Sequence, residues 1–307
     1  MFGSILRGSG QVIFMESPWS GLLNFAAMFW AAYAGGTTLA VAIGSVVGTV
    51  VATLVASRLQ AGRTAIKAGL YGFNGMLIGA GIPTFLEHTL FMWEILIFVC
   101  GISAIVTLAL GNALRRWSIP GLTFPFILCT WLVLLAAGNI PTLHAIGPSA
   151  AIWPGGPDAM FGTHAFVRAV LTSISQIYFV DNPVSGGIFL LAIAIHSPRC
   201  AGFAFLGAAL AVVLSLWFGA DRGMVYHGLW GYSAILTAAA IGAVFIAPGT
   251  RALVYALAAT VFSVLVHAAL STLFQPAGIP VFTFPFVVTT WIFLLARAGL
   301  AETASGK

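Results

Sequence analysis

The sequence has very few charged residues, with 12 Lys and Arg and 7 Asp and Glu among 307 residues, or 6%. A soluble globular chain carries about 25% of such residues, so the composition excludes a soluble domain. Apolar residues make up 60% of the chain, and its mean hydropathy is +1.06. We therefore predict an integral membrane protein. The net charge of +5 comes without any run of Lys or Arg, so it indicates no nucleic acid partner and is typical of loops facing anionic lipids.

The sequence also lacks the motifs of known enzyme classes. Its six histidines show no short metal-ligand spacing, and no H-E-x-x-H, G-x-S-x-G, P-loop or dinucleotide-binding glycine motif occurs. We predict that the chain is not an enzyme and binds no metal or cofactor. The three cysteines, Cys100, Cys129 and Cys200, lie in or beside apolar stretches and imply no disulfide framework. Residues 8–11 interrupt the first apolar run, so no cleavable signal is expected.

The apolar residues are arranged in stretches that predict an all-α membrane protein. A spanning helix needs about 20 largely apolar residues, and ten stretches are candidates: 21–35, 37–57, 68–82, 91–110, 122–138, 185–197, 201–219, 228–246, 251–270 and 282–299. Two shorter amphipathic stretches, 5–15 and 164–179, are too short to cross, and a proline follows each within a few residues. The predicted fold therefore has ten transmembrane helices plus two re-entrant half-helices.

Three sequence blocks occur twice in the same order. Residues Gln11–Gly21 match Gln176–Gly186 at an offset of 165, with the acid Glu16 opposite the acid Asp181, and Gly69–Leu77 match Gly228–Leu236 at 159. Pro120–Phe126 match Pro280–Phe286 at 160, and this match continues through Thr130-Trp131 and Thr290-Trp291. Composition alone would align Leu, Ala and Gly in any membrane chain, but not Gln, Thr, Pro and Trp in register. We therefore predict a duplication, with a first half at residues 1–150 and a second half at 151–307.

The basic residues predict the orientation of the two halves. If the N-terminus is cytoplasmic, ten of the twelve basic residues lie on that side, and only Arg168 and Arg222 lie outside. Both termini are then cytoplasmic. Five spans per half make the second half enter the membrane from the opposite side, so the repeats are inverted. Inverted repeats place a site near the midplane, where short, proline-interrupted segments of both halves meet.

Two repeated polar residues are the first candidates for that site. Gln11 and Gln176 each place a primary amide in or beside a short apolar half-helix, where an unsatisfied polar group costs about 2–7 kcal/mol. Each amide either caps a backbone group or faces a pore, and its recurrence in both halves favours the pore. Thr123 and Thr283 each lie between two prolines. This pattern predicts either a broken re-entrant segment with exposed oxygens or a kinked spanning helix whose threonine bonds back one turn.

Aromatic residues beside these motifs are candidates for the walls of a pathway. Phe14 with Phe73, and Phe179 with Tyr232, would supply flat apolar faces if the repeats converge, although a single Phe among 24 more often only packs. We assign the repeated glycines, such as Gly69, to close helix packing.

Charge is missing where energy coupling would need it. No carboxylate pair, Asp–Lys couple or Arg series lies inside a predicted span, and Glu94 stands alone near a span end. An ion-coupled or voltage-driven transporter carries such charges within the membrane, so we predict passive passage. His227, directly before a repeated glycine, either lines a mouth or is a satisfied interfacial histidine, and we favour the second interpretation.

The repeated Gln-x-x-Phe, Gly-x-x-Gly-aromatic and Pro-x-x-Thr-Phe-Pro-Phe motifs resemble the urea transporter family over nearly the whole chain. The resemblance implies a homotrimer in a bacterial inner membrane, with lipid around it and one urea-conducting pore per subunit. It also implies that Gln11 and Gln176 begin half-helices whose carbonyls form acceptor ladders. The implied substrate pathway contains Gln11, Val12, Phe14, Phe73, Leu77, Thr123, Gln176, Ile177, Phe179, Tyr232 and Thr283.

The sequence departs from the family pattern at two of these positions. Gln176 stands where some bacterial members have Glu, which makes the pore neutral, and Tyr232 stands where Phe is frequent, which adds a hydroxyl to one wall. A channel for another small neutral solute, such as a short amide, ammonia or water, is the alternative. It is weakened by the lack of paired intramembrane histidines or an Asn-Pro-Ala repeat. A non-transporting scaffold or receptor gives no reason for Gln and Thr to recur at equivalent places.

Overall fold

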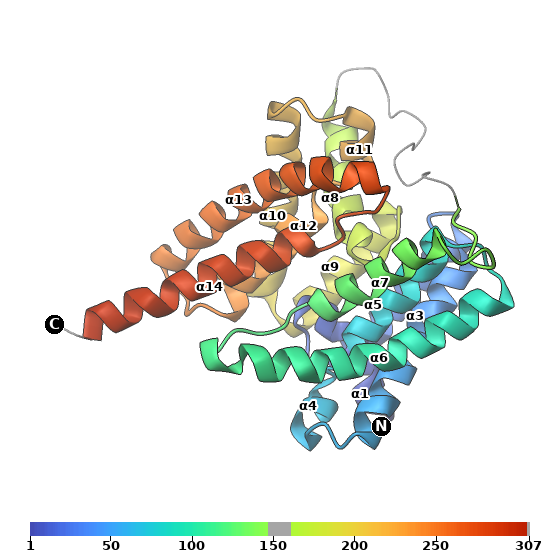
Figure 1. The fold of residues 1–307 in the computed structure, drawn as a ribbon. Helices are drawn as coiled ribbons and strands as arrows, with labels where there is room; N and C mark the ends of the chain where they lie inside the picture. Colours follow the sequence, from blue (N-terminus) through green and yellow to red (C-terminus); the bar gives the residue numbers. More distant parts are fainter. Residues whose placement is uncertain (147–160, 306–307) are drawn as a thin grey trace.

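The computed structural model describes residues 1–146 and 161–305, the last eight of these by their backbone alone. Within that part of the chain the fold is all-helical, and β-structure is limited to one bridge between Leu86 and Ala145. The predicted boundary between residues 150 and 151 lies outside the described residues. The helices are α1 Phe2–Gly10, α2 Pro18–Tyr33, α3 Leu39–Arg58, α4 Arg63–Ala68, α5 Gly72–Phe85, α6 Leu90–Leu114, α7 Phe124–Ala137, α8 Thr163–Ser175, α9 Pro183–His196, α10 Pro198–Trp217, α11 Arg222–Tyr226, α12 Tyr232–Ala239, α13 Thr250–Phe274 and α14 Phe284–Ser305 (Figure 1).

Helices α2, α9 and α10 begin in the same way, at a polar cap followed by proline. The side chains of Ser17, Asn182 and Ser197 each accept a hydrogen bond from the backbone N–H three residues later, at 3.2, 2.9 and 3.2 Å. Proline occupies the first helical position after each cap, where its missing N–H costs nothing. The caps at Ser17 and Asn182 fix where α2 and α9 begin, directly after the two segments that are predicted to be re-entrant.

Every predicted apolar stretch contains a helix, but the helices differ in length. Within residues 1–146 and 161–305, four have the length and hydropathy to cross a membrane: Leu39–Arg58, Leu90–Trp117, Pro198–Trp217 and Thr250–Ala277. Segments Thr163–Tyr178 and Pro183–His196, bent by 72°, could form a fifth crossing. Helix α7 has 14 residues and rises about 21 Å, less than the ~30 Å of hydrocarbon in a bilayer. The structure therefore confirms several membrane-capable helices, while the full layout of ten spans stays a prediction.

Local structure accounts for the changes of offset between the repeated blocks. Helix α9 has 14 residues where α2 has 16, and Ser197 alone joins α9 to α10 where residues 34–38 join α2 to α3. The offset consequently falls from 165 to 159. A π-helical turn at Ala240–Val244 follows α12. Residues 245–249 then lead to α13, whereas only residues 86–89 lead from α5 to α6, and this one extra residue gives the later offset of 160.

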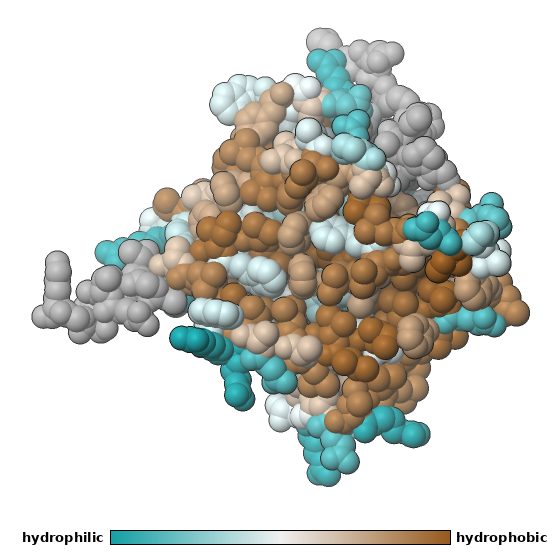
Figure 2. Space-filling view, in the orientation of Figure 1, coloured by the Kyte–Doolittle hydropathy of each residue, from teal (hydrophilic) through white to brown (hydrophobic). Residues whose placement is uncertain are grey.

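Apolar side chains cover the middle of the molecular surface. Figure 2 shows hydrophobic residues across the central part of this face and hydrophilic residues around its edges, including the upper and lower ends. Large apolar side chains on several helices are exposed in the single chain, including Phe98 at 65% and Val213 at 51%. Monomeric soluble proteins seldom expose such broad apolar surfaces. The distribution agrees with a multi-pass membrane protein.

Candidate functional site

Helices α1 and α8, the two that are predicted to be re-entrant, end with the same local structure. A 3-10 turn, Gln11–Ile13 or Gln176–Tyr178, follows α1 and α8, and the next residue is left-handed, with φ of 59° at Phe14 and 61° at Phe179. An L-residue in this region costs roughly 1–2 kcal/mol, and such strain is concentrated at functional sites. The prediction that Gln11 and Gln176 begin the half-helices is wrong. Both glutamines come after the helix, because each half-helix tightens into the 3-10 turn at that residue.

The side-chain amides of these glutamines hold distant backbone carbonyls. Nε2 of Gln11 donates to the carbonyl of Ala68, and Nε2 of Gln176 donates to that of His227, both at 2.9 Å. The structure therefore shows the capping interaction for both glutamines, and their part in solute passage stays a prediction.

The glycines that follow these two carbonyls allow close packing, as predicted. Gly69 and Gly228 have φ of 84° and 75°. A Cβ atom at either position would lie 2.4 Å from a backbone nitrogen of the re-entrant helix, that of Gly8 or Ser173. Glycine is therefore required where each loop rests on its re-entrant helix.

Thr123 and Thr283 meet between the two halves. Their hydroxyl oxygens are 2.7 Å apart, and the residues are only 2% and 4% exposed. Thr123 directly precedes α7, and Thr283 directly precedes α14. The interpretation of a kinked spanning helix with a threonine bonded back one turn is wrong, because α6 and α7 are separate helices and the hydroxyls bond to each other.

Reciprocal hydrogen bonds join the halves around this threonine pair. Trp131 Nε1 donates to the carbonyl of Pro280, and Trp291 Nε1 donates to that of Pro120, both at 2.8 Å. Further away, Ser20 Oγ donates to the carbonyl of Ala192, and Ser185 Oγ donates to that of Ala27, again at 2.8 Å. In both pairs of bonds, a side chain of each half donates to a carbonyl of the other half, and the donors and acceptors occupy equivalent positions in the two halves. The two halves therefore meet through matched contacts.

We expect Trp131→Phe and Trp291→Phe to destabilise the protein to a similar degree. Each change removes one donor from a partly buried carbonyl and some ring packing, at a cost of about 1–2 kcal/mol. Thermal unfolding of the purified protein in detergent would measure the loss, with Trp19→Phe as a control because Trp19 is 71% exposed. Two unchanged melting temperatures would contradict the stabilising role of these bonds.

The remaining predicted pathway residues differ in how far they are buried. The ring of Phe14 contacts Phe286 at a centroid distance of 6.3 Å, and Phe179 contacts Phe126 at 6.0 Å, which are equivalent pairs. Val12, Leu77 and Ile177 are buried, whereas Phe73 and Tyr232 are partly buried. Only the aromatic surroundings of Phe14 and Phe179 are thus seen to match, and their membership of one pathway stays a prediction.

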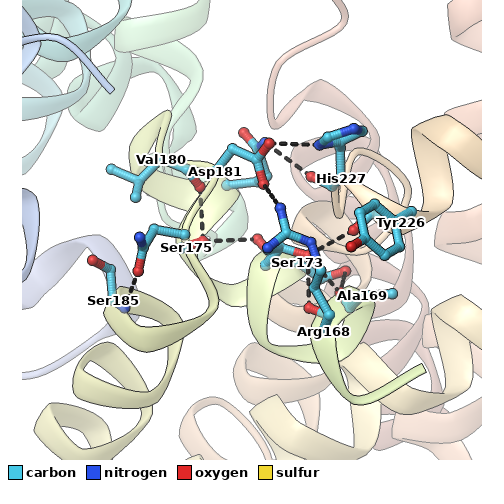
Figure 3. A network of polar contacts seen from close by, with 12 residues as sticks. Arg168, Ala169, Ser173, Ser175, Val180, Asp181, Ser185, Tyr226 and His227 are labelled. Atoms are coloured by element: carbon cyan, nitrogen blue, oxygen red, sulfur yellow. Dashed lines mark hydrogen bonds and ion pairs between the residues drawn. The ribbon is translucent and has the colours of Figure 1, made fainter. Parts of the chain in front are cut away.

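A charged cluster that sequence reasoning missed lies beside the second re-entrant helix (Figure 3). The Asp181 carboxylate accepts a hydrogen bond from Arg168 Nη2 at 3.2 Å and contacts His227 Nδ1 at 2.5 Å. His227 is therefore the satisfied histidine that we favoured. The acid at this position was visible as a match to Glu16, but its partners are 13 and 46 residues away.

Comparison with known proteins gives consistent matches over most of the chain. The family model described as "Urea transporter" matches residues 2–298. Urea transporter 1 of sheep (Ovis aries), goat (Capra hircus) and mouse (Mus musculus) is in each case 32% identical over 303 residues. Each match covers 95% of this chain and 76% of the relative.

Proposed function

The chain belongs to the urea transporter family, and from this membership we propose that it lets urea diffuse passively through a pore between its two halves. It is a multi-pass membrane protein and a transporter, not an enzyme. The observation that carries the pore's location is the Thr123–Thr283 contact, because it places equivalent polar residues of both halves together in the buried interior.

The matched contacts support an inverted-repeat architecture of ten spans and two re-entrant helices. Reciprocal bonds such as Trp131–Pro280 and Trp291–Pro120 are what a pseudo-two-fold axis between the halves would produce. In Figure 1, α1 lies toward the lower end of the molecule and α8 toward the upper end. Re-entrant helices entering from opposite membrane faces would occupy such positions.

Urea suits a pathway with these components. It is planar, small and neutral, so aromatic faces can contact its two sides while oxygen acceptors receive its N–H groups. Phe14, Phe73, Leu77, Phe179 and Tyr232 would supply the apolar walls. Carbonyls near Val12 and Ile177, with the hydroxyls of Thr123 and Thr283, would supply acceptors. An apolar slot offers ions no compensation for lost hydration, so ions would be excluded.

The assembly and location follow from the family and the distribution of charge. We propose a homotrimer, surrounded by lipid, in a bacterial inner membrane with both termini in the cytoplasm. Ten of the twelve basic residues then face the cytoplasm. Arg168 and Asp181 neutralise each other in an ion pair. We therefore do not assign either charge to the binding of a coupling ion.

Stopped-flow light scattering tests the proposed function directly. Proteoliposomes containing the purified protein should shrink and recover with a urea permeability far above that of empty liposomes, without any ion gradient. Parallel runs with methylurea, acetamide and water separate a urea pathway from a channel for another neutral solute. A permeability equal to that of empty liposomes, or a flux that requires an ion gradient, would overturn the proposal.

A further inference from the structure

The two halves, otherwise matched, differ in charge around the end of the re-entrant helix. In the second half, the Asp181 side chain is 8% exposed and lies between Arg168, at 23%, and His227, at 13% (Figure 3). A carboxylate withdrawn from water is tolerated when charged or polar N–H groups hold both of its oxygens. Asp181 meets that condition, because Oδ1 faces the guanidinium and Oδ2 faces the imidazole.

This cluster holds the same short segment that receives the Gln176 amide. The carbonyl of His227 accepts from Gln176 Nε2 at 2.9 Å, while its imidazole contacts Asp181. The neighbouring Tyr226 is held twice, since its carbonyl accepts from Thr172 Oγ1 at 3.1 Å and its ring lies 4.6 Å from the Arg168 guanidinium carbon. Residues 226–228 are thus fixed against the re-entrant helix by charge as well as by hydrogen bonds.

The first half has no counterpart of this charged cluster. At the offsets of the repeated blocks, Gly3, Glu16 and Ala68 occupy the positions of Arg168, Asp181 and His227. Glu16 is exposed. The bond from the Gln11 amide to the Ala68 carbonyl is retained at the same 2.9 Å. The neighbouring Lys67 carbonyl accepts from the exposed Arg7 guanidinium at 3.4 Å, so the first glutamine is held without a buried carboxylate.

We propose that Asp181 is a positioning residue for urea passage in the second half. Through Arg168 and His227 it fixes the carbonyl that anchors Gln176, and so the 3-10 turn that leads to Phe179. This inference rests on the proposed function, because it assigns Gln176 and Phe179 to the urea pathway. It makes the two halves unequal: one end of the pathway depends on a buried negative charge and the other does not.

The experiment measures urea permeability of the full-length chain in proteoliposomes for a set of single variants. Asp181→Asn keeps the shape of the side chain but removes its charge, and should lower urea permeability about fivefold to tenfold, as expected for losing charge-assisted hydrogen bonds. Asp181→Glu keeps the charge and should restore most of the permeability. Glu16→Gln, the matched change in the first half, should leave permeability unchanged.

A double variant tests whether Asp181 acts through the histidine. His227→Asn should lower permeability about as much as Asp181→Asn, and combining the two should add little, since residues in one network are not additive. Elution from size exclusion is compared for every variant. Where Asp181→Asn does not yield folded protein, His227→Asn and Asp181→Glu carry the comparison.

The outcomes separate this inference from the function on which it rests. A wild-type protein without urea permeability rejects the proposed function itself. A permeable wild type with an equally permeable Asp181→Asn variant overturns the positioning role alone. A loss in Asp181→Glu as deep as in Asp181→Asn shows that a negative charge at this position does not restore permeability, and an equal loss in Glu16→Gln removes the asymmetry; either result also overturns the inference.

Discussion

Replacing Gly186 with alanine is expected to prevent recovery of folded protein, whereas the same change at the adjacent Gly187 should be tolerated. A Cβ atom on Gly186 would lie 2.0 Å from the carbonyl oxygen of Leu171 in α8, while a Cβ on Gly187 has no atom within 4 Å. The atom that the new Cβ would meet belongs to the backbone of α8, so α8 itself would have to move. Overpacking a close contact costs about 1–3 kcal/mol, and more where nothing can yield.

The neighbouring pair supplies its own control. At Gly187, alanine gains helix propensity of about 1 kcal/mol over glycine, so that variant should unfold at an equal or slightly higher temperature. Yield of monodisperse protein and thermal unfolding in detergent measure both effects. Gly21, which occupies the equivalent position in the first half, would place a Cβ 1.7 Å from the carbonyl oxygen of Leu6, and Gly21→Ala should fail in the same way. Normal yield of Gly186→Ala would show that the re-entrant helix can shift.

Much of the fold follows from patterns that are local in sequence. The stretch predicted at 251–270 is α13, Thr250–Phe274, because a long apolar run has few alternatives to a helix. Short helices also occur at the half-helices predicted over 5–15 and 164–179, while their re-entrant course stays a prediction. The capped prolines Pro18 and Pro183 mark where the next helix starts. Hydropathy and helix capping depend on residues that are close together in the sequence, so they can be predicted from a single sequence.

The position of the two glutamines at the C-terminal ends of α1 and α8 could not be predicted in this way. Nothing in the residue types around Gln11 or Gln176 signals that an α-helix ends there, because no glycine or proline follows directly. The left-handed Phe14 and Phe179 are imposed by tertiary packing against the intrinsic preference of an aromatic residue. Only the repetition of the Gln-x-x-Phe pattern indicated that the position was special.

Contacts between segments far apart in the chain were also beyond sequence reasoning. Trp131 and Trp291 were recognised as a repeated pair, but their exchange of bonds with Pro280 and Pro120 depends on how the halves face each other. The sequence identifies Asp181 only as the counterpart of Glu16, because Arg168 and His227 reach it only after folding. The periodicity of apolar residues predicts which face of a helix is apolar, but it does not predict which loop packs against that helix.

Valine at both Thr123 and Thr283 is expected to lower urea permeability about tenfold or more, with each single change costing less. Valine has nearly the shape of threonine, so the change removes a hydroxyl and little volume. In the native chain each hydroxyl uses part of its hydrogen-bonding capacity on the other, at 2.7 Å, and retains capacity for a passing solute. In a single variant the remaining hydroxyl loses its partner but can still bond to urea, which is why the double variant should be the slower.

Permeability and stability together distinguish a pathway role for these threonines from a purely structural one. Thr272→Val is the control, because the Thr272 hydroxyl is on an exposed helix face and only bonds back to the carbonyl of Ala268. If the pair served only to lock α7 against α14, both single variants would lower the unfolding temperature by the same amount as the double, and urea permeability would stay at the wild-type level. A hydroxyl lining the pathway gives the opposite result: each removal slows urea, and the effects accumulate because the two oxygens act on the same solute in turn.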